Sequence, residues 1–534
     1  MRLRFLLVSL LVFLLVAKAV VFYPAVFWSL LVLVPLFLLG CYDMLQKRHT
    51  VLRNYPLVGH IRWLMEDIRP MIQQYFVESD LDGAPINRVF RSVVYQRSKK
   101  QMDTIPYGTK FDVYRIGYEW IAHSLAAKNL TDIDSDLRVW IGGPHCQQPY
   151  HASLLNISAM SYGALSHRAI EALNGGAKIG GFAHNTGEGG ISRYHLESGG
   201  DLIWQIGTGY FGCRNQDGHF NEVLFAEKAQ SASVKMIEIK LSQGAKPGHG
   251  GLLPACKNTL EIAKIRGVKA YTQVNSPATH SAFSTPVELM LFIERLRTLS
   301  LGKPVGIKLC VGQRSDFLGL CKAMIGTGIK PDFITVDGDE GGTGAAPLEY
   351  ANSIGMPLME ALVFVCDSLN GFDLKKDIKI IASGKMFTGF HLVKRLSIGA
   401  DLCNSARGMM LAMGCIQSLQ CNTGRCPAGI TTQRKSLVNG LDVDDKRQRV
   451  ASFHKETLKS VAEILAAAGL THSRELSRRH VFRRISQTQT CSYQQIYPPL
   501  EVGSLLAAPY PEHYAEEMEL ANAEMFNHTV CDVD

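Results

Sequence analysis

From residue 151 onward, short apolar segments alternate with amphipathic helical segments, and this alternation constrains the fold more than any other feature of the chain. Helical patterns include residues 166–177, 285–299 and 357–368. Strands that alternate with helices form parallel sheets with right-handed crossovers, and eight such units over about 250 residues predict a closed barrel. The eight predicted strands are residues 153–159, 181–184, 202–207, 236–241, 305–311, 333–336, 378–382 and 401–404.

The fold class predicted is therefore α/β, a (β/α)8 TIM barrel over residues 151–434. A doubly wound open sheet is the alternative arrangement of the same units. No G-x-G-x-x-G sequence follows the first predicted strand, which disfavours a dinucleotide-binding sheet. The same absence predicts that NAD(P)H does not bind this chain directly.

Residues 1–46 predict a transmembrane hairpin. Residues 5–17 are apolar except for one serine, and residues 19–42 form a second apolar run with two prolines. About 20 helical residues cross the hydrocarbon core of a bilayer. The turn between the two runs is expected at residues 22–25.

Positive residues flank the hairpin on both sides: Arg2 and Arg4 before it, Lys47 and Arg48 after it. This pattern predicts a multi-pass protein of the inner (cytoplasmic) membrane, with both ends and the catalytic domain facing the cytoplasm. A cleaved signal peptide is the alternative, since residues 17–19 resemble a cleavage site. The second apolar run favours retention of the hairpin.

Two further segments are predicted outside the barrel, an N-terminal α+β extension at residues 47–150 and a helical C-terminal tail at residues 435–534. The net charge of +8 is spread along the chain, with small basic clusters at residues 97–100 and 474–484. We expect these clusters to lie on exposed or membrane-proximal surface, and we expect no nucleic-acid partner. The 13 cysteines form no regular framework, which indicates a reducing compartment.

Three of the cysteines share one loop, with the spacing Cys415-x5-Cys421-x4-Cys426. A structural zinc site uses four ligands, usually in pairs, whereas this loop has three thiols and no nearby histidine. Three thiolates suit an iron–sulfur cluster better. The alternative is that these cysteines are small buried apolar side chains.

The loops that follow the predicted strands are rich in glycine and polar residues, and a barrel assembles its active site at these strand ends. Backbone groups after the first strand suit a flat ring, and Lys308 within an apolar strand predicts contact with a polar cofactor edge. Small residues and a cation after the last two strands predict a phosphate site. The candidate cofactor-binding residues are Ala159, Met160, Ser161, Asn185, Lys240, Lys308, Asp337, Gly341, Gly342, Ser383, Gly384, Ala406 and Arg407.

The loop after the fourth strand contains two lysines and an amide, Lys240, Lys246 and Gln243. This combination favours an anionic small molecule, and the alternative is an ordinary basic loop. Glu188, in the glycine-rich loop after the second strand, either contacts substrate or caps a helix. Together the loops predict a phosphate-tailed cofactor lying across the mouth of a barrel.

Several long strings, in order, resemble the FMN-binding synthase domain of the glutamate synthase large-subunit family. They are MSYGALS, HNTGEGG, IEIKLSQGAKPGHGG, GDEGGTGAAPL and the three-cysteine loop, within residues 153–433. The resemblance implies a barrel with FMN and a 3Fe-4S cluster on Cys415, Cys421 and Cys426. It also implies reduction of 2-iminoglutarate, formed from 2-oxoglutarate and ammonia, to glutamate or an N-substituted glutamate.

The resemblance also implies roles for individual residues. Lys308 would face the N1/O2 edge of the flavin, and Ser383, Gly384, Ala406 and Arg407 would hold the FMN phosphate. The catalytic set would be Lys246, Glu188 and Gln243. The oxo-acid pocket would be lined by Glu188, Lys240, Gln243, Lys246 and Arg266.

The chain departs from the family pattern in three ways. A membrane hairpin stands where a full glutamate synthase has an amidotransferase domain, and the β-helical C-terminal domain is missing. A separate amidotransferase, or free ammonia, and a separate electron-donor protein are therefore expected. His249 and Leu252 stand where the family usually has glutamate and glutamine, which is expected to change the preferred oxo acid.

Two alternatives to a glutamate-forming enzyme remain open. One is a membrane-linked flavin dehydrogenase or oxidase of a hydroxy or amino acid that delivers electrons to a quinone, which the hairpin favours. The other is a non-catalytic electron-transfer subunit, which would not require Glu188 and Lys246.

Overall fold

The computed structural model describes residues 1–101, 104–134 and 136–526. It divides into two compact units, Met1–Arg88 and Val89–Asp534. The second unit contains every residue predicted to bind a cofactor, a substrate or a metal.

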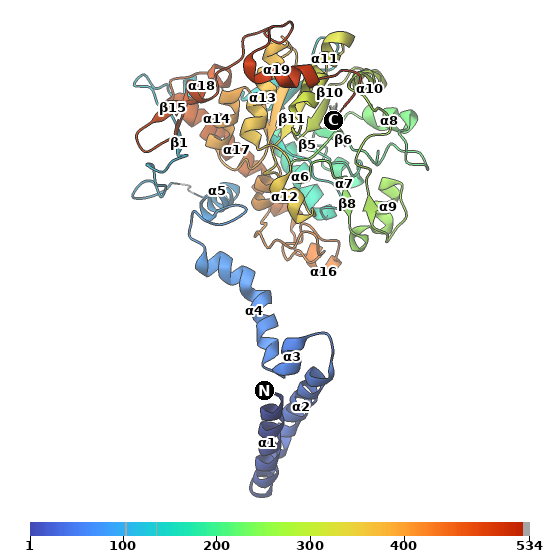
Figure 1. Cartoon of the computed structure of the whole chain (residues 1–534), viewed down its shortest axis with the longest axis vertical. Coiled ribbons are helices and arrows are strands. Elements are labelled where there is room, and N and C mark those ends of the chain that lie inside the picture. Colours follow the sequence, from blue (N-terminus) through green and yellow to red (C-terminus); the bar gives the residue numbers. More distant parts are fainter. Residues whose placement is uncertain (102–103, 135, 527–534) are drawn as a thin grey trace, which may run out of the picture. The chain divides into compact units, whose positions relative to one another are not determined.

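Eight parallel strands close into a barrel in the second unit, which confirms the predicted fold class (Figure 1). Neighbours in chain order pair with one another, and β13 pairs with β4 to close the ring. Each strand overlaps its predicted segment, although β5 shares only His184 with residues 181–184. In order the strands are β4 (Leu155–Ile157), β5 (His184–Asn185), β6 (Leu202–Ile206), β7 (Val234–Lys240), β10 (Val305–Leu309), β11 (Phe333–Asp337), β12 (Lys379–Ser383) and β13 (Leu402–Ser405).

Helices follow the strands and cover the barrel (Figure 1). The Ser166 hydroxyl accepts a hydrogen bond from the Ala169 N–H at the start of α6, and such caps satisfy N–H groups that a helix start leaves unpaired. The helices are α6 (His167–Gly180), α7 (Arg193–Leu196), α8 (Glu222–Ala229), α9 (Leu260–Arg266), α10 (Pro286–Leu299), α11 (Arg314–Thr327), α12 (Leu348–Ser353), α13 (Leu358–Gly371), α14 (Gly389–Ile398), α15 (Arg407–Ala412) and α16 (Lys435–Val438).

The N-terminal unit begins with α1 (Arg2–Phe22) and, after a 3-10 turn, α2 (Leu30–Leu45). The helical segments Arg2–Phe22 and Pro24–Leu45 are long and apolar enough to cross a membrane. The turn falls at the predicted position. Residues 19–22 were predicted to begin the second apolar segment, but they form the end of the first helix. Two shorter helices follow, α3 (Thr50–Asn54) and α4 (Gly59–Ile72).

A segment that precedes the barrel in the sequence pairs with segments that follow it. Strand β1 (Glu119–Ile121) joins β14 (Val481–Arg484) and β15 (Thr490–Ser492) in an antiparallel sheet. The tail therefore contains strands as well as its predicted helices, since a partner more than 350 residues away in sequence completes the sheet. The remaining elements are α5 (Arg88–Ser98), α17 (Val443–Ala467), α18 (Tyr493–Ile496), α19 (Glu512–Leu520), and the pairs β2 (Arg138–Ile141) with β3 (Tyr150–Ser153) and β8 (Leu252–Leu253) with β9 (Val274–Asn275).

Glu119 joins this small sheet to the barrel. Its carboxylate accepts hydrogen bonds from Tyr493 at 2.7 Å and from the Arg483 Nε at 2.9 Å, and it pairs with Lys394 of α14. Burial alone would raise the pKa of Glu119, but Lys394 and the hydrogen bonds outweigh burial and hold the pKa at about 2.

Glu119→Gln is expected to lower the free energy of unfolding at pH 7 by roughly 3 kcal/mol, because it leaves the largely buried Lys394 without its partner charge. The folded pKa of Glu119 lies below its ordinary value of 4.5. The contribution of Glu119 to the free energy of unfolding is therefore complete above pH 4.5 and is lost as the pH falls toward 2. Urea unfolding at several pH values should show the difference between wild type and variant shrinking in acid, and a pH-independent difference would contradict this assignment.

Candidate active site at the barrel mouth

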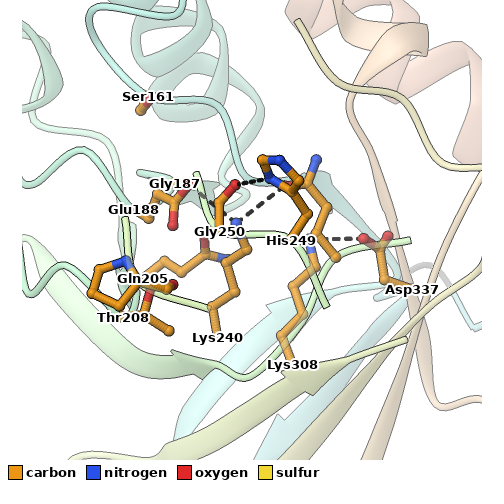
Figure 2. Close-up of polar contacts among 12 residues, drawn as sticks. Ser161, Gly187, Glu188, Gln205, Thr208, Lys240, His249, Gly250, Lys308 and Asp337 are labelled. Carbon is orange, nitrogen blue, oxygen red and sulfur yellow. Dashed lines mark hydrogen bonds and ion pairs between the residues drawn. The ribbon is translucent and has the colours of Figure 1, made fainter. Parts of the chain in front are cut away.

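Charged side chains from several strands converge at the carboxyl end of the barrel (Figure 2). Lys240, the last residue of β7, lies 3.1 Å from a carboxylate oxygen of Glu188. Lys308 of β10 lies 3.3 Å from a carboxylate oxygen of Asp337, the last residue of β11. Parallel strands in a barrel end on one face, which is why residues far apart in sequence meet here.

Three buried cations surround the single carboxylate of Glu188: Lys240, Lys246 and Arg266. Burial alone would raise the pKa of Glu188, but Lys240, then Arg266 and Lys246, lower it below its ordinary value. Burial lowers the pKa of Arg266 to about 10 and also lowers the pKa of Lys246. Even without Lys246, two cations, Lys240 and Arg266, face the one carboxylate of Glu188. The group therefore carries excess positive charge, which suits an anion.

Gln243 belongs to the same group. Its side-chain oxygen accepts a hydrogen bond from the Lys240 ammonium at 3.0 Å, and its side-chain nitrogen donates to the Gly342 carbonyl at 3.5 Å. The structure thus brings together all five residues predicted to line a substrate pocket: Glu188, Lys240, Gln243, Lys246 and Arg266.

Lys308 lies between two acidic groups inside the barrel. Burial alone would lower its pKa, but Asp337 and then Glu238 outweigh burial and raise it. Lys308 is therefore positively charged, as its proposed contact with an electron-rich ring edge requires.

Sequence reasoning missed the residues that fill the barrel interior beneath this site. Glu238 is fully buried in β7 and accepts hydrogen bonds from Asn185 at 2.8 Å, Gln205 at 2.6 Å and Thr335 at 2.6 Å. Lys308 was identified as a charged residue within an apolar strand. Glu238 has the same pattern, because its carboxylate lies within the largely apolar segment Met236–Lys240, so the sequence could also have identified Glu238. His280 was also missed, and it lies 2.9 Å from the backbone oxygen of Lys240.

The predicted ring-binding backbone lies against the next loop. The N–H of Met160 donates to the Asn185 carbonyl at 3.2 Å. A Cβ on Gly187, which has a φ of +63°, would lie 2.9 Å from the Ser161 nitrogen, so only glycine allows this approach. Ala159 and Ser161 follow β4 beside it, which is compatible with a flat ring seated on these loops.

The donor set after β12 and β13 fits a phosphate. Burial is the largest cause that lowers the pKa of Lys385, and the nearby cation of Arg407 is the second. The two cations therefore lie close together. Burial lowers the pKa of Arg407 as well. Two neighbouring half-buried cations favour an anion, and the carboxylate of Glu340 offsets only part of their charge, since burial still leaves both pKa values lowered. The flanking small residues are Ser383, Gly384 and Ala406.

Gly342 makes room for the Arg407 side chain, because a Cβ on residue 342 would lie 2.8 Å from the Arg407 Cδ. Arg407 also donates a hydrogen bond to the backbone oxygen of Glu340. Gly341 is held by its N–H, which donates to the Gly338 carbonyl at 2.9 Å. The β11 loop thus brings glycine backbone up to the proposed phosphate cation.

A small pocket opens beside the Glu188–Lys240 pair (Figure 2). Its volume of about 20 Å³ is enough for one water molecule. His249 lines it, whereas Leu252 lies in β8 and pairs with Asn275. The full lining is Glu188, Thr208, Lys240, Leu241, Ser242, Gly248, His249, Gly250, Gly251, Pro277 and Ala278.

The three predicted metal ligands share one electrostatic environment. Burial, and then Cys421 and Cys426, raise the pKa of Cys415 to about 11. Burial alone would raise the pKa of Cys426, but backbone N–H groups of Thr431, Ile430 and Ala428 outweigh it and lower the pKa. Backbone donors to sulfur suit a thiolate ligand. Within the described ranges, no group of three or more His, Cys, Asp or Glu side chains has a ready-made metal-binding arrangement.

The sequence of the barrel unit is similar to known proteins. Residues 95–471 match the family model for the conserved region in glutamate synthase. The chain is 37% identical over 484 residues to the glutamate synthase large subunit-like protein YerD of Bacillus subtilis, covering 83% of this chain and 91% of that protein. It is 34% identical over 315 residues to the archaeal glutamate synthase (NADPH) of Methanocaldococcus jannaschii, covering 59% of this chain and 58% of that protein.

Among solved structures, a lactate oxidase of Pediococcus acidilactici matches with a TM-score of 0.44 and 15% identity, covering 74% of this chain and 94% of that chain. The family model covers well over half of the chain, and the Bacillus subtilis protein is matched along most of its length. The chain therefore belongs to the glutamate synthase family of oxidoreductases.

Proposed function

We propose that this chain catalyses the reductive amination of 2-oxoglutarate, through 2-iminoglutarate, to glutamate or an N-substituted glutamate. The observation that carries the proposal is the excess of buried positive charge around Glu188. Buried cations are costly unless they are paired, and a dicarboxylate substrate supplies two negative charges. Family membership supports the same class of reaction.

Each residue of the charged group around Glu188 has a definite part in this reaction. Arg266 and Lys240 bind substrate carboxylates through charge-assisted hydrogen bonds. Lys246, whose pKa burial lowers, donates a proton at the oxygen or nitrogen on the substrate's 2-carbon. Gln243 holds the Lys240 ammonium in place. Because the pocket is small, the Glu188–Lys240 contact must open to admit the substrate.

FMN is the proposed cofactor, and when bound it would supply hydride chemistry at N5. Ala159, Met160, Ser161 and Asn185 would support its ring. Lys308, held by Asp337, would place a fixed positive charge at the N1/O2 edge. Arg407, with Gly341, Gly342, Ser383, Gly384 and Ala406 around it, would hold the phosphate.

A 3Fe-4S cluster on Cys415, Cys421 and Cys426 is the proposed entry point for electrons, since such clusters carry one electron at a time. An electron-donor protein and an amidotransferase, or free ammonia, complete the scheme. Within the pocket, His249 is proposed to change which oxo acid or amine is accepted, because the imidazole contributes no fixed negative charge where the family has a carboxylate.

The test uses anaerobically purified protein, reduced chemically and mixed with 2-oxoglutarate and either ammonium or methylamine. Glutamate or N-methylglutamate should form only when reductant, oxo acid and amine are all present. Lys246→Met should lower turnover by about 100-fold, whereas Lys264→Met, an exposed lysine of α9, should not. Oxidation of a hydroxy or amino acid with quinone reduction, and no product from 2-oxoglutarate, would select the dehydrogenase alternative.

We also propose that α1 and α2 anchor the chain in the inner membrane, with the barrel in the cytoplasm. The support is the length and apolarity of the two helical segments and the basic residues at both flanks. Protein lacking residues 1–46 should move from the membrane pellet to the soluble fraction and keep its flavin. A full-length chain released by alkaline carbonate, or a truncated chain that still pellets, would contradict the anchor.

A further inference from the structure

A buried lysine outside the predicted site faces the three-cysteine loop. Lys257 lies in the short helical turn Ala255–Lys257, between β8 and α9, and its side chain is almost fully buried at 3% exposure. Its ammonium donates to the Cys421 carbonyl at 2.7 Å and to the Ala164 carbonyl at 3.2 Å. It therefore connects the cysteine loop to the loop after β4 that carries Ser161.

The charge of Lys257 has no carboxylate partner among the residues that the structure describes. The groups that interact electrostatically with the Lys257 ammonium are the sulfur atoms of Cys421, Cys256 and Cys426. An ammonium has three N–H donors, and two of them have carbonyl acceptors here. A buried cation without a counter-charge is costly, so an anion at the cysteine loop would offset that cost.

The turn is held firmly enough to fix this charge. The Lys257 N–H donates to the Pro254 carbonyl at 2.9 Å. The side-chain amide of the next residue, Asn258, donates to the carbonyls of Lys269 and Thr272 at 2.8 and 2.9 Å. Gly424 of the cysteine loop also lies against this turn, with its Cβ position 3.8 Å from the Cys256 sulfur.

We infer that Lys257 is the buried counter-charge of the iron–sulfur cluster and raises the cluster's reduction potential; the inference rests on the proposed cluster. A cluster with three thiolate ligands is anionic and becomes one unit more negative when it accepts an electron. A fixed positive charge therefore stabilises the reduced form more than the oxidised form. By joining Cys421 to Ala164, the same side chain also positions the cluster loop beside the proposed flavin loop. Lys257 is a positioning residue and does not touch the substrate.

The experiment compares full-length wild type with Lys257→Met, Lys257→Arg and Lys264→Met, each purified anaerobically in detergent. Iron and FMN are quantified, and the midpoint potential of the cluster is measured by redox titration with electron paramagnetic resonance. Lys257→Met should change the reduced-to-oxidised ratio at fixed potential by at least tenfold, a negative shift of about 59 mV for one electron. Lys257→Arg and the exposed-lysine control Lys264→Met should stay closer to wild type than this.

The remaining outcomes also decide the question. Loss of iron in Lys257→Met but not in Lys257→Arg supports the counter-charge, because arginine keeps the positive charge and its N–H donors whereas methionine has neither. An unchanged potential in Lys257→Met, or loss of iron in both variants, overturns it. Wild-type protein with FMN and no iron would overturn the cluster and this inference while leaving the flavin proposal intact.

Discussion

Cys421→Ser is expected to abolish iron binding and to stop electron delivery from an external donor to the flavin, while FMN stays bound. A serine hydroxyl does not supply the soft thiolate that iron–sulfur chemistry requires. Removing a group that only supports a metal ligand costs up to about 100-fold in metal affinity. Because Cys421 is itself a proposed ligand, the expected loss of iron affinity is larger than this. Iron content, visible absorbance and reduction by a protein donor are the measurements.

Cys491→Ser is the matched control, since Cys491 is also a partly exposed free cysteine, in β15, away from the three-cysteine loop. It should keep its full iron content. Chemical reduction of the flavin by dithionite should proceed in both variants, because a small reductant does not need the cluster. Unchanged iron in Cys421→Ser would show that the ligand assignment is wrong.

Lys308→Met should lower turnover by about 100- to 1000-fold, the loss typical of removing one preorganised electrostatic donor. The substitution keeps the length of the side chain and removes the buried charge next to Asp337. The flavin potential should fall, because the charge that favours the anionic reduced ring is gone. Stopped-flow reduction and a redox titration of the flavin are the measurements.

The single variant also leaves Asp337 buried without its partner, which is expected to destabilise the protein by roughly 3 kcal/mol. A double variant, Lys308→Met with Asp337→Asn, removes both charges and should recover stability without recovering turnover. A stable double variant with a wild-type flavin potential would show that Lys308 does not lie at the flavin edge.

The barrel was predictable because its signal is local. Eight apolar segments separated by helical patterns lie within single stretches of sequence, and helix starts such as Ser166 and Thr285 are marked by capping residues. The sheet formed by β1, β14 and β15 was not predictable, because its strands are short and their partners lie far apart in sequence.

Burial of charged residues was the hardest feature to predict. The basic cluster at residues 474–484 was expected on the surface, yet Arg478 is buried and donates to Asp367 at 2.6 Å. Lys257 gave no signal at all, because only the folded chain places its turn against Cys421. By contrast, the resemblance carried by the glycine-rich strings grouped Glu188, Lys240 and Lys246, and these three side chains lie close together in the fold.

We propose above all that one FMN lies over the barrel mouth and exchanges electrons with a cluster on the cysteine loop. The most direct test is cofactor analysis of anaerobically purified full-length protein, with FMN released by acid, iron quantified and electron paramagnetic resonance spectra recorded. We expect one FMN and one three-iron cluster per chain. A folded, colourless protein without flavin or iron would contradict it.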